Sequence, residues 1–400
     1  MLIIENGRVL TMAGRTYESG SVIVRDNKIA GVIQGQLEDF RKGRESLPFS
    51  VTGEELRNAQ VLDACGGWIM PGLVESHCHM GITEEKKGTE GDDCNENVEP
   101  VTPTLRAVDA INPMDAAFDD AVRAGITTAM IGPGSANVVG GQFALVKTKG
   151  RCIDNLVLMA PAAMKAAFGE NPKVNYSGQN RSPVTRMAIA DLLRKELFEA
   201  RAYLEEKGRK PEYRYECWRP VFERRIPLKA HVHRADDIFT SIRIAREFHL
   251  DMTLDHCSEG HLIAEEIAES GFPAIVGPDF ASRNKIEVQN MAFKTAGVLE
   301  KAGVPVAIMT DHPVSLIQSL PLCAGMAVKA GLSEEAGLRA ITIQAARICR
   351  MDDRIGSLEP GKDADIAVFS GNPMETFTKT LYTIIDGKLC YDYRKKKMRT

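Results

Sequence analysis

The sequence lacks the features that would place it in a membrane or in a disulfide framework. No apolar run approaches the roughly 18 residues needed to cross a bilayer, and the first residues carry neither a basic segment nor a long apolar one. The nine cysteines are an odd number without regular spacing, and no two form a Cys-x-x-Cys pair. We therefore expect reduced cysteines in a cytoplasmic protein.

A strong charge of either sign is also absent. The formal net charge of −4 at pH 7 gives no electrostatic reason to bind nucleic acid or an anionic membrane. Residues 132–142 are rich in glycine, but they have neither the order of a P-loop nor that of a dinucleotide site, so we expect a loop that lines a pocket or connects elements. A small-molecule substrate and a homo-oligomer are expected.

The middle of the chain predicts a parallel sheet. Apolar runs of strand length alternate with stretches of helical pattern, and 400 residues with 44% hydrophobic content suit a β/α barrel with a smaller companion domain. The predicted helices are residues 115–124, 185–207, 236–248, 262–270 and 291–302, and the predicted strands are residues 125–131, 228–231, 252–256, 272–276 and 304–310.

Both ends of the chain have a pattern of apolar residues that differs from that of the middle. Short alternating apolar runs with Asn-Gly and Asp-Asn turns predict β-hairpins in residues 1–66, and similar runs follow residue 355. We predict that residues 1–66 and 355–400 form one small β domain, and that residues 67–354 form the barrel.

Histidines gather where the apolar strands end. The chain has only eight of them, and His77 and His79 close the run 68–79. Residues i and i+2 of a strand point the same way, about 7 Å apart, so two such imidazoles can bind one metal ion. His231 and His256 end later apolar runs, and Asp311 follows another. Carboxyl ends of barrel strands converge on one mouth, where these residues would meet.

This order of residues resembles the metal-dependent amidohydrolase superfamily, and within it the imidazolonepropionase-related branch. Residues 70–77 before the first histidine pair, residues 356–367 near the end, and residues 132–142 and 168–173 carry the similarity. The resemblance implies an α/β fold, a distorted TIM-type (β/α)8 barrel with a small β-sandwich made from both chain ends.

The resemblance also implies a catalytic metal centre. Its ligands would be His77, His79, His231, His256 and Asp311. Imidazoles and a carboxylate suit Zn²⁺, which acidifies bound water to a pKa near 7. Asp311 would take the proton of the attacking water and pass it to the leaving nitrogen, and His256 would also belong to the catalytic set.

The number of metal ions depends on a lysine. Binuclear members of the superfamily use a carboxylated lysine as a bridge, and Lys165 is the nearest match, although its context is not a clean strand end. Lys147 and Lys229 are rivals, so one ion is favoured over two.

Other residues are candidates for substrate contact or for packing. Substrate contact is considered for His233, His312, Gln142, Asn137 and the acidic loop 83–99 with Asp92, Asn95 and Glu96. Cys78 and Cys257 are expected to pack on the far side of their strands, and His249 and His261 to be surface residues.

The preferred function is hydrolysis of a carbon–nitrogen bond in a cyclic amide, an N-acyl compound or a dipeptide-like molecule. A deaminase acting on a purine- or pyrimidine-like ring is the alternative within the enzymes. A non-catalytic scaffold is the alternative of another class.

Overall fold

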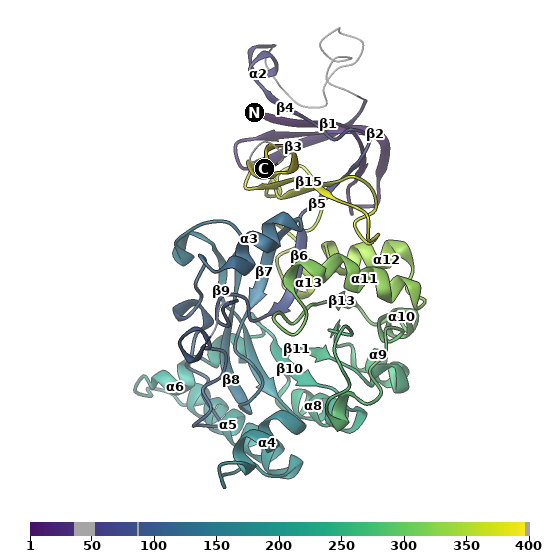
Figure 1. Cartoon of the computed structure of the whole chain (residues 1–400). Helices are drawn as coiled ribbons and strands as arrows, with labels where there is room; N and C mark the ends of the chain where they lie inside the picture. The colour runs from purple at the N-terminus through teal and green to yellow at the C-terminus, as the bar shows by residue number, and fades with distance from the viewer. Residues whose placement is uncertain (36–52, 86–87, 397–400) are drawn as a thin grey trace.

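The computed structural model describes residues 1–35, 53–85 and 88–396, so the parts of the predicted domain ranges at residues 36–52, 86–87 and 397–400 lie outside the described residues. Two eight-stranded sheets are present, one above the other in Figure 1. In the part of the chain that is described, no helix is long and apolar enough to cross a membrane.

The smaller unit is a sheet built from both ends of the chain. Its strand order is β16-β15-β14-β5-β1-β2-β3, with β4 paired to β1, and the purple and yellow segments lie together in Figure 1. The strands are β1 (Leu2–Leu10), β2 (Thr16–Arg25), β3 (Lys28–Gln34), β4 (Gln60–Asp63), β5 (Trp68–Pro71), β14 (Ile366–Phe369), β15 (Thr380–Ile385) and β16 (Lys388–Asp392). Strand β5 pairs with β1 and β14 in the small sheet, although it lies in residues 67–354, the range predicted for the barrel. The two domain ranges remain a prediction.

The larger unit is a nearly closed barrel, which confirms the predicted fold class. Its strand order is β13-β12-β11-β10-β9-β8-β7-β6. The strands are β6 (Leu73–Cys78), β7 (Ile126–Ile131), β8 (Val139–Lys147), β9 (Val157–Ala167), β10 (Leu228–Val232), β11 (Met252–His256), β12 (Ala274–Val276) and β13 (Val306–Ile308). The backbone N–H of His79 donates to the carbonyl oxygen of His312 at 2.8 Å, which links the ends of the first and last strands.

One part of the predicted parallel order is wrong. Strand β8 runs antiparallel to both β7 and β9. The connections at residues 132–138 and 148–156 carry no α-helix, and antiparallel neighbours can be joined by such short segments whereas parallel ones need a long crossover. Residues 139–142 of the predicted glycine-rich loop therefore belong to β8.

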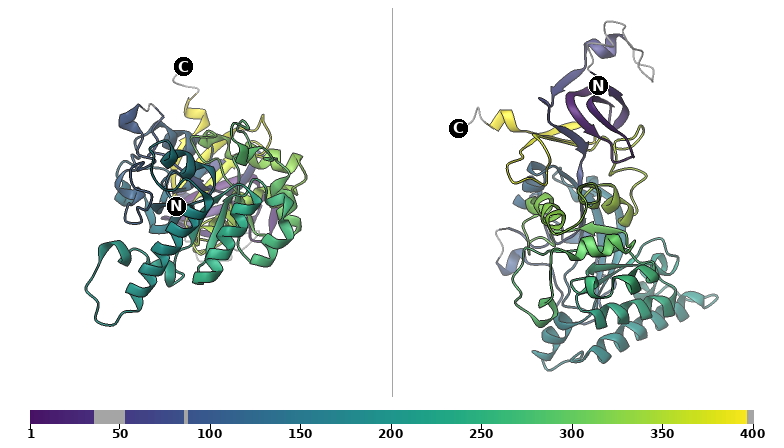
Figure 2. Two further views of the ribbon diagram at one scale, coloured as in Figure 1. Left: turned by 90° about the horizontal axis from the view of Figure 1, so that it is seen from below. Right: turned by 90° about the vertical axis from the view of Figure 1, so that its right-hand side faces the viewer.

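Helices surround the barrel on its outer side, and the second view of Figure 2 shows them below the small sheet. Around the barrel lie α3 (Ala116–Arg123), α4 (Glu170–Ser177), α5 (Arg186–Glu205), α6 (Tyr213–Glu216), α7 (Arg219–Phe222), α8 (Ala235–Phe248), α9 (Ala264–Ser270), α10 (Thr295–Lys301), α11 (Leu320–Lys329), α12 (Glu334–Ala340) and α13 (Ile343–Ile348). Short helices α2 (Gly53–Arg57) and α14 (Tyr393–Lys396) flank the small sheet. The five predicted helices correspond to α3, α5, α8, α9 and α10.

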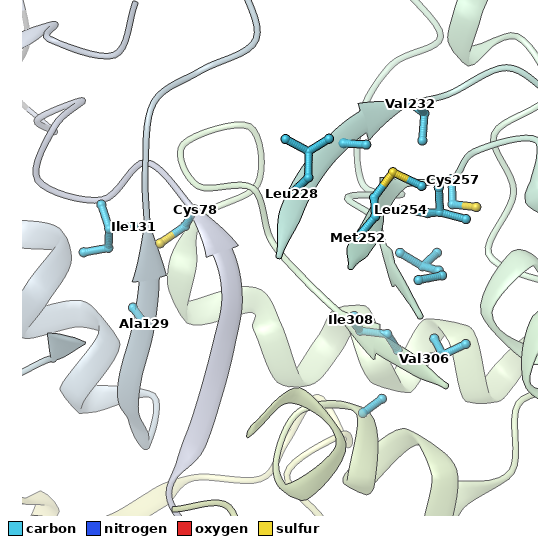
Figure 3. Packing of buried hydrophobic residues seen from close by; sticks show 14 of the residues in the cluster. Cys78, Ala129, Ile131, Leu228, Val232, Met252, Leu254, Cys257, Val306 and Ile308 are labelled. Atoms are coloured by element: carbon cyan, nitrogen blue, oxygen red, sulfur yellow. The ribbon is translucent and has the colours of Figure 1, made fainter. Parts of the chain in front are cut away.

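Alternation along the strands divides the barrel into two faces. Leu228 and Val232 of β10 and Leu254 of β11 point outward into the apolar layer beneath the helices (Figure 3). Cys78 and Cys257 lie in the same layer, which confirms that both cysteines are packing residues. The intervening residues of β10, Lys229 and His231, therefore face the barrel interior.

The two units are joined at Gly72 and by a buried lysine. A Cβ at Gly72, between β5 and β6, would lie 2.2 Å from Thr127 Oγ1, so only glycine allows this close approach to β7. Lys147 of β8 is 3% exposed and donates to Asp363 at 3.1 Å and to Asp365, both in the segment that leads into β14. These contacts attach the small sheet to the barrel wall.

Candidate metal centre

Two groups of buried side chains with metal-ligand chemistry lie at the carboxyl ends of the barrel strands. The first contains His77, His79 and Asp311, and the second contains His231, His233 and His256. Within each group the ligand atoms lie within 4.8 Å of one another. The structure thus brings together the five residues that the sequence proposes as ligands, and it adds His233 to them.

The first group converges on one carboxylate oxygen. Asp311 Oδ1 lies 3.1 Å from His79 Nε2 and 3.6 Å from His77 Nε2. Lys165 Nζ lies 3.3 Å from His77 Nε2. Side chains from β6, β9 and the segment after β13 therefore face the same small volume.

Fixed acceptors orient three of the rings. Asp255 Oδ2 lies 2.7 Å from His77 Nδ1, the Gly132 carbonyl oxygen 2.7 Å from His79 Nδ1, and the Gly277 carbonyl oxygen 2.9 Å from His256 Nδ1. When Nδ1 carries the proton and donates to these acceptors, Nε2 keeps a free lone pair. Each ring is thus held in the tautomer that can bind a cation through Nε2.

The second group is a cluster of three closely packed rings. The ring centroid of His231 lies 4.7 Å from that of His233 and 4.4 Å from that of His256. His233 stacks on His256 at 4.5 Å, and its Nδ1 lies 2.8 Å from Ser258 Oγ. His231 Nε2 lies 3.3 Å from Asn171 Nδ2.

The electrostatics favour neutral imidazoles at His77, His231 and His256 beside an ionised carboxylate. At His79, burial favours a lower pKa, but Cys94 and the hydrogen bond with Asp311 raise the pKa to about 10. Burial lowers the pKa of His77 and His231 well below the ordinary value and that of His256 to about 4. Burial also lowers the pKa of Lys165 to about 8. For Asp311, burial favours a higher pKa, but the hydrogen bond with His79 and the nearby histidines lower the pKa below its ordinary value.

The residues fit a divalent metal on independent structural grounds. Among the described residues, the buried side-chain atoms without a hydrogen-bond partner include His231 Nδ1, a state that proteins rarely tolerate. Asp311 Oδ1 is buried, and its neighbours are the Nε2 atoms of two other candidate ligands, His77 and His79. The backbone of His256 (φ 72°) and of Asp311 (φ 52°) lies in the left-handed region, which is costly for such residues and is often found at functional sites. Neutral imidazole nitrogens and a carboxylate oxygen are the donors that Zn²⁺ and similar ions bind.

The three lysines named from the sequence have different environments. Lys165 is 0% exposed and lies two residues before the end of β9. It therefore does lie at a strand end, and the sequence-based expectation that it does not is wrong. It stands opposite Lys229 on β10, whose Nζ lies 3.1 Å from Asp255 Oδ2 and contacts the Ser76 carbonyl oxygen. Lys147 binds the acidic residues near β14 instead. Of the three lysines, only Lys165 contacts a candidate ligand histidine.

A cavity of about 360 Å³ opens above the two groups. Among the predicted substrate-contact residues, His233, Asp92 and Asn95 line it. A larger cavity of about 660 Å³ lies elsewhere, between α10, β13, α12 and α13, and the described residues in its wall include no histidine.

Four residues predicted to contact substrate do not line the cavity. Glu96 lines another cavity instead. Gln142 Nε2 donates to the Pro103 carbonyl oxygen at 3.0 Å. Asn137 donates to Thr102 Oγ1 and accepts from Tyr176, so its amide is used within the protein. The Nδ1 of His312 accepts the N–H of Ile317, and its ring is fully buried. The structure gives the last three side chains a role in fixing loops.

Two charged residues of the site were missed in the sequence, although a signal existed. Asp255 and Glu75 are both fully buried within apolar strands, and a charge in such a position needs a partner. Glu75 accepts the N–H of His77 at 3.0 Å and both donors of Thr310, at 2.9 and 2.7 Å, and burial raises its pKa to about 7. It therefore ties β6 to the end of β13.

Three further residues of the site lie on loops or helix starts and gave no comparable signal. Asn171, Lys285 and Glu287 contact one another or the second group of histidines. Nothing in their local sequence indicates that they meet.

Comparison with known proteins finds a family and relatives that match most of the chain. The model of the amidohydrolase family matches residues 68–390. Imidazolonepropionase of Klebsiella pneumoniae subsp. pneumoniae is 24% identical over 408 residues, covering 94% of this chain and 93% of that protein. Amidohydrolase tasK of Hapsidospora irregularis is 26% identical over 387 residues, which cover 86% of this chain but only 38% of that protein's length.

A solved structure agrees over nearly the whole chain. The amidohydrolase from Thermotoga maritima MSB8 is 33% identical and has a TM-score of 0.89, with 98% of this chain and 100% of that chain covered. The match includes both sheets described above.

Proposed function

Because the chain belongs to the amidohydrolase family, we propose that its two histidine groups, with Asp311 and Lys165, form the metal centre of a hydrolase that cleaves a carbon–nitrogen bond in a small molecule. Metal-dependent hydrolysis of such bonds, outside ordinary protein peptide bonds, is the chemistry of the family and of its imidazolonepropionase-like branch. The convergence of both groups on one strand-end cavity is the observation that carries the proposal.

The sequence favoured one metal ion, but the two separate groups of candidate ligands lead us to propose two divalent ions, with zinc as the resident metal. His77, His79 and Asp311 would hold one ion, and His231 and His256 the other. Lys165 supports the pair, since its Nζ lies 3.3 Å from His77 Nε2 and its charge also lowers the pKa of His231 and His256. Addition of the lysine amine to CO₂, with loss of one proton, would yield a carbamate that would help to hold the ions.

Bound divalent ions supply Lewis acidity toward the substrate carbonyl and increase the acidity of water at the site. The carboxylate of Asp311 then accepts a proton from the attacking water and returns it to the nitrogen as the carbon–nitrogen bond breaks. Asp255 and the carbonyl oxygens of Gly132 and Gly277 keep the ligand rings in position. The preferred substrates are N-acyl amino acids, dipeptides and cyclic amides.

The proposal is tested by metal content and by turnover. Elemental analysis of the purified protein should find about two divalent ions per chain, the number of ligand groups. Metal-loaded protein is then assayed on N-acyl amino acids, dipeptides and cyclic ureides. Release of ammonia from a purine- or pyrimidine-like ring, with no cleavage of these amides, would identify a deaminase instead.

Asp311→Asn tests the proton transfer. An amide cannot accept the proton, so turnover should fall by about 10² to 10⁴-fold. Asp251→Asn is the matched control, because Asp251 lies just before β11 and pairs with Arg224 and Arg350 at the surface. Full turnover by an Asp311→Asn variant that retains its metal would contradict the proposed role.

A further inference from the structure

We infer that Lys285 recognises a carboxylate on the substrate, next to the bond that is cleaved. This inference rests on the proposed function and specifies its substrate class: N-acyl amino acids or dipeptides with a free carboxylate, rather than neutral cyclic amides. Lys285 lies in the segment between β12 and α10 and lines the cavity above the histidines.

The cavity contains one side chain suited to a fixed anion. Among the described residues that line it, Lys285 is the only lysine or arginine. The carboxylates in the wall belong to Asp311, which is a proposed metal ligand, and to Asp92 on the loop that follows the first histidine pair. An anionic group in this cavity therefore has a single positively charged side-chain partner apart from the metal centre.

Two contacts hold the ammonium group of Lys285 in place. Nζ donates to Asn171 Oδ1 at 2.7 Å and to Glu287 Oε1 at 2.9 Å. An ammonium group has three N–H donors, and its side chain is 28% exposed, so one donor is left for a ligand in the cavity. A cation already fixed by two acceptors loses little conformational entropy when it binds a third.

The same contacts place the ammonium group close to the second histidine group. Asn171 binds Lys285 through Oδ1 and lies 3.3 Å from His231 Nε2 through Nδ2. Its Nδ2 also donates to Ser135 Oγ at 2.7 Å, which fixes the amide orientation. One asparagine side chain thus separates the cation from a proposed metal ligand. A carboxylate bound to Lys285 would therefore lie beside the proposed metal centre, near the bond that is cleaved.

A purely structural role for Lys285 would be to neutralise Glu287. That carboxylate is 1% exposed, and its Oε1 lies 3.8 Å from His233 Nε2. It also accepts the backbone N–H of Glu170 at 2.8 Å. Both roles require the positive charge, but only the recognition role makes binding depend on a carboxylate in the ligand.

The probe is 4-oxopentanoate, in which a CH₂ replaces the scissile nitrogen of N-acetylglycine, so it cannot be hydrolysed. Its uncharged partner is 4-oxopentanamide. Calorimetric titration of the metal-loaded protein should show that the acid binds at least about tenfold more tightly than the amide, as expected for a hydrogen bond between charged groups. In Lys285→Met this preference should fall to about onefold, and Lys285→Arg should keep most of it.

Lys294→Met is the matched control, because Lys294 is an exposed lysine at the start of α10 and does not line the cavity. It should keep the wild-type preference. If Lys285→Met alone does not fold, the double variant Lys285→Met with Glu287→Gln removes the buried charge and allows the same measurement.

Three results would overturn the inference. They are equal binding of acid and amide by the wild type, an unchanged preference in the methionine variant, and a failure of the metal-loaded wild type to bind either probe. The proposed function is judged separately, by metal content and by amide hydrolysis. A hydrolase that cleaves only uncharged cyclic amides would keep the proposed function and refute the role of Lys285.

Discussion

Asp255→Asn should weaken metal binding at His77 while leaving the barrel folded. Asp255 is fully buried, and its Oδ2 lies 2.7 Å from His77 Nδ1 and 3.1 Å from Lys229 Nζ. Its Oδ1 accepts the hydroxyl of Thr253 at 2.7 Å. Asparagine keeps the shape and one carbonyl acceptor, but it removes the negative charge that strengthens the hydrogen bond from His77.

The size of the effect follows from these contacts. A hydrogen bond to a charged group contributes about 1.5–3 kcal/mol, whereas a neutral one contributes about 0.5–1.5 kcal/mol. The difference of about 1–1.5 kcal/mol corresponds to about tenfold in affinity, since every 1.4 kcal/mol is tenfold. Loss of the partner behind a ligand histidine costs about 10–100-fold in general. We therefore expect metal affinity to fall by about tenfold to hundredfold.

The assay is a titration of zinc-free protein with zinc in chelator-buffered solutions, together with urea unfolding to check the fold. Asp251→Asn makes the same chemical change at a site that is 29% exposed and bound to two arginines at the surface. It should bind zinc as the wild type does. If Asp255→Asn also bound zinc with wild-type affinity, Asp255 would not position His77 for metal binding.

Three further changes have defined outcomes. Lys165→Met should lower the measured metal content from about two ions per chain to one or fewer, because the proposed bridging group is lost; two retained ions would rule out the bridge. Lys147→Met leaves the buried carboxylate of Asp365 without its lysine, so urea unfolding should show a loss of about 3–5 kcal/mol, and an unchanged midpoint would refute this. Burial raises the pKa of Asp279 to about 6, so the folded state holds this proton more strongly than the unfolded one, and stability falls as pH rises from about 4 to 6. Asp279→Asn should show a smaller fall than the wild type over that range; an identical pH dependence would contradict the assignment.

The predicted strands and helices of the barrel lie close to their observed positions, but strands β8 and β9 and helices α4, α11, α12 and α13 were not predicted. The predicted strand at residues 252–256 is β11, and the predicted helix at residues 185–207 is α5 (Arg186–Glu205). These elements are long or sharply bounded, and their apolar period is a property of the local chain. The antiparallel direction of β8 could not be read in the same way, because strand direction depends on which neighbours pair and not on the pattern within the strand.

The residue types of the proposed metal centre were also available from the sequence. His77, His79, His231, His256 and Asp311 each end or follow an apolar strand, and a barrel brings all such positions to one mouth. His256 shows the limit of that reasoning. Alternation would place it on the face of Leu254, and a left-handed backbone with φ of 72° reorients the chain at this residue.

The sequence by itself therefore determined the barrel class and the types of the candidate ligands, because periodicity and residue chemistry are local. Only the tertiary structure decided which charges meet. His77 and Asp255 are 178 residues apart, His77 and Lys165 are 88 apart, and Asn171 and Lys285 are 114 apart. Such pairs depend on strand register across the barrel and on the paths of its loops. Neither can be recognised from the residues that surround each partner in the sequence.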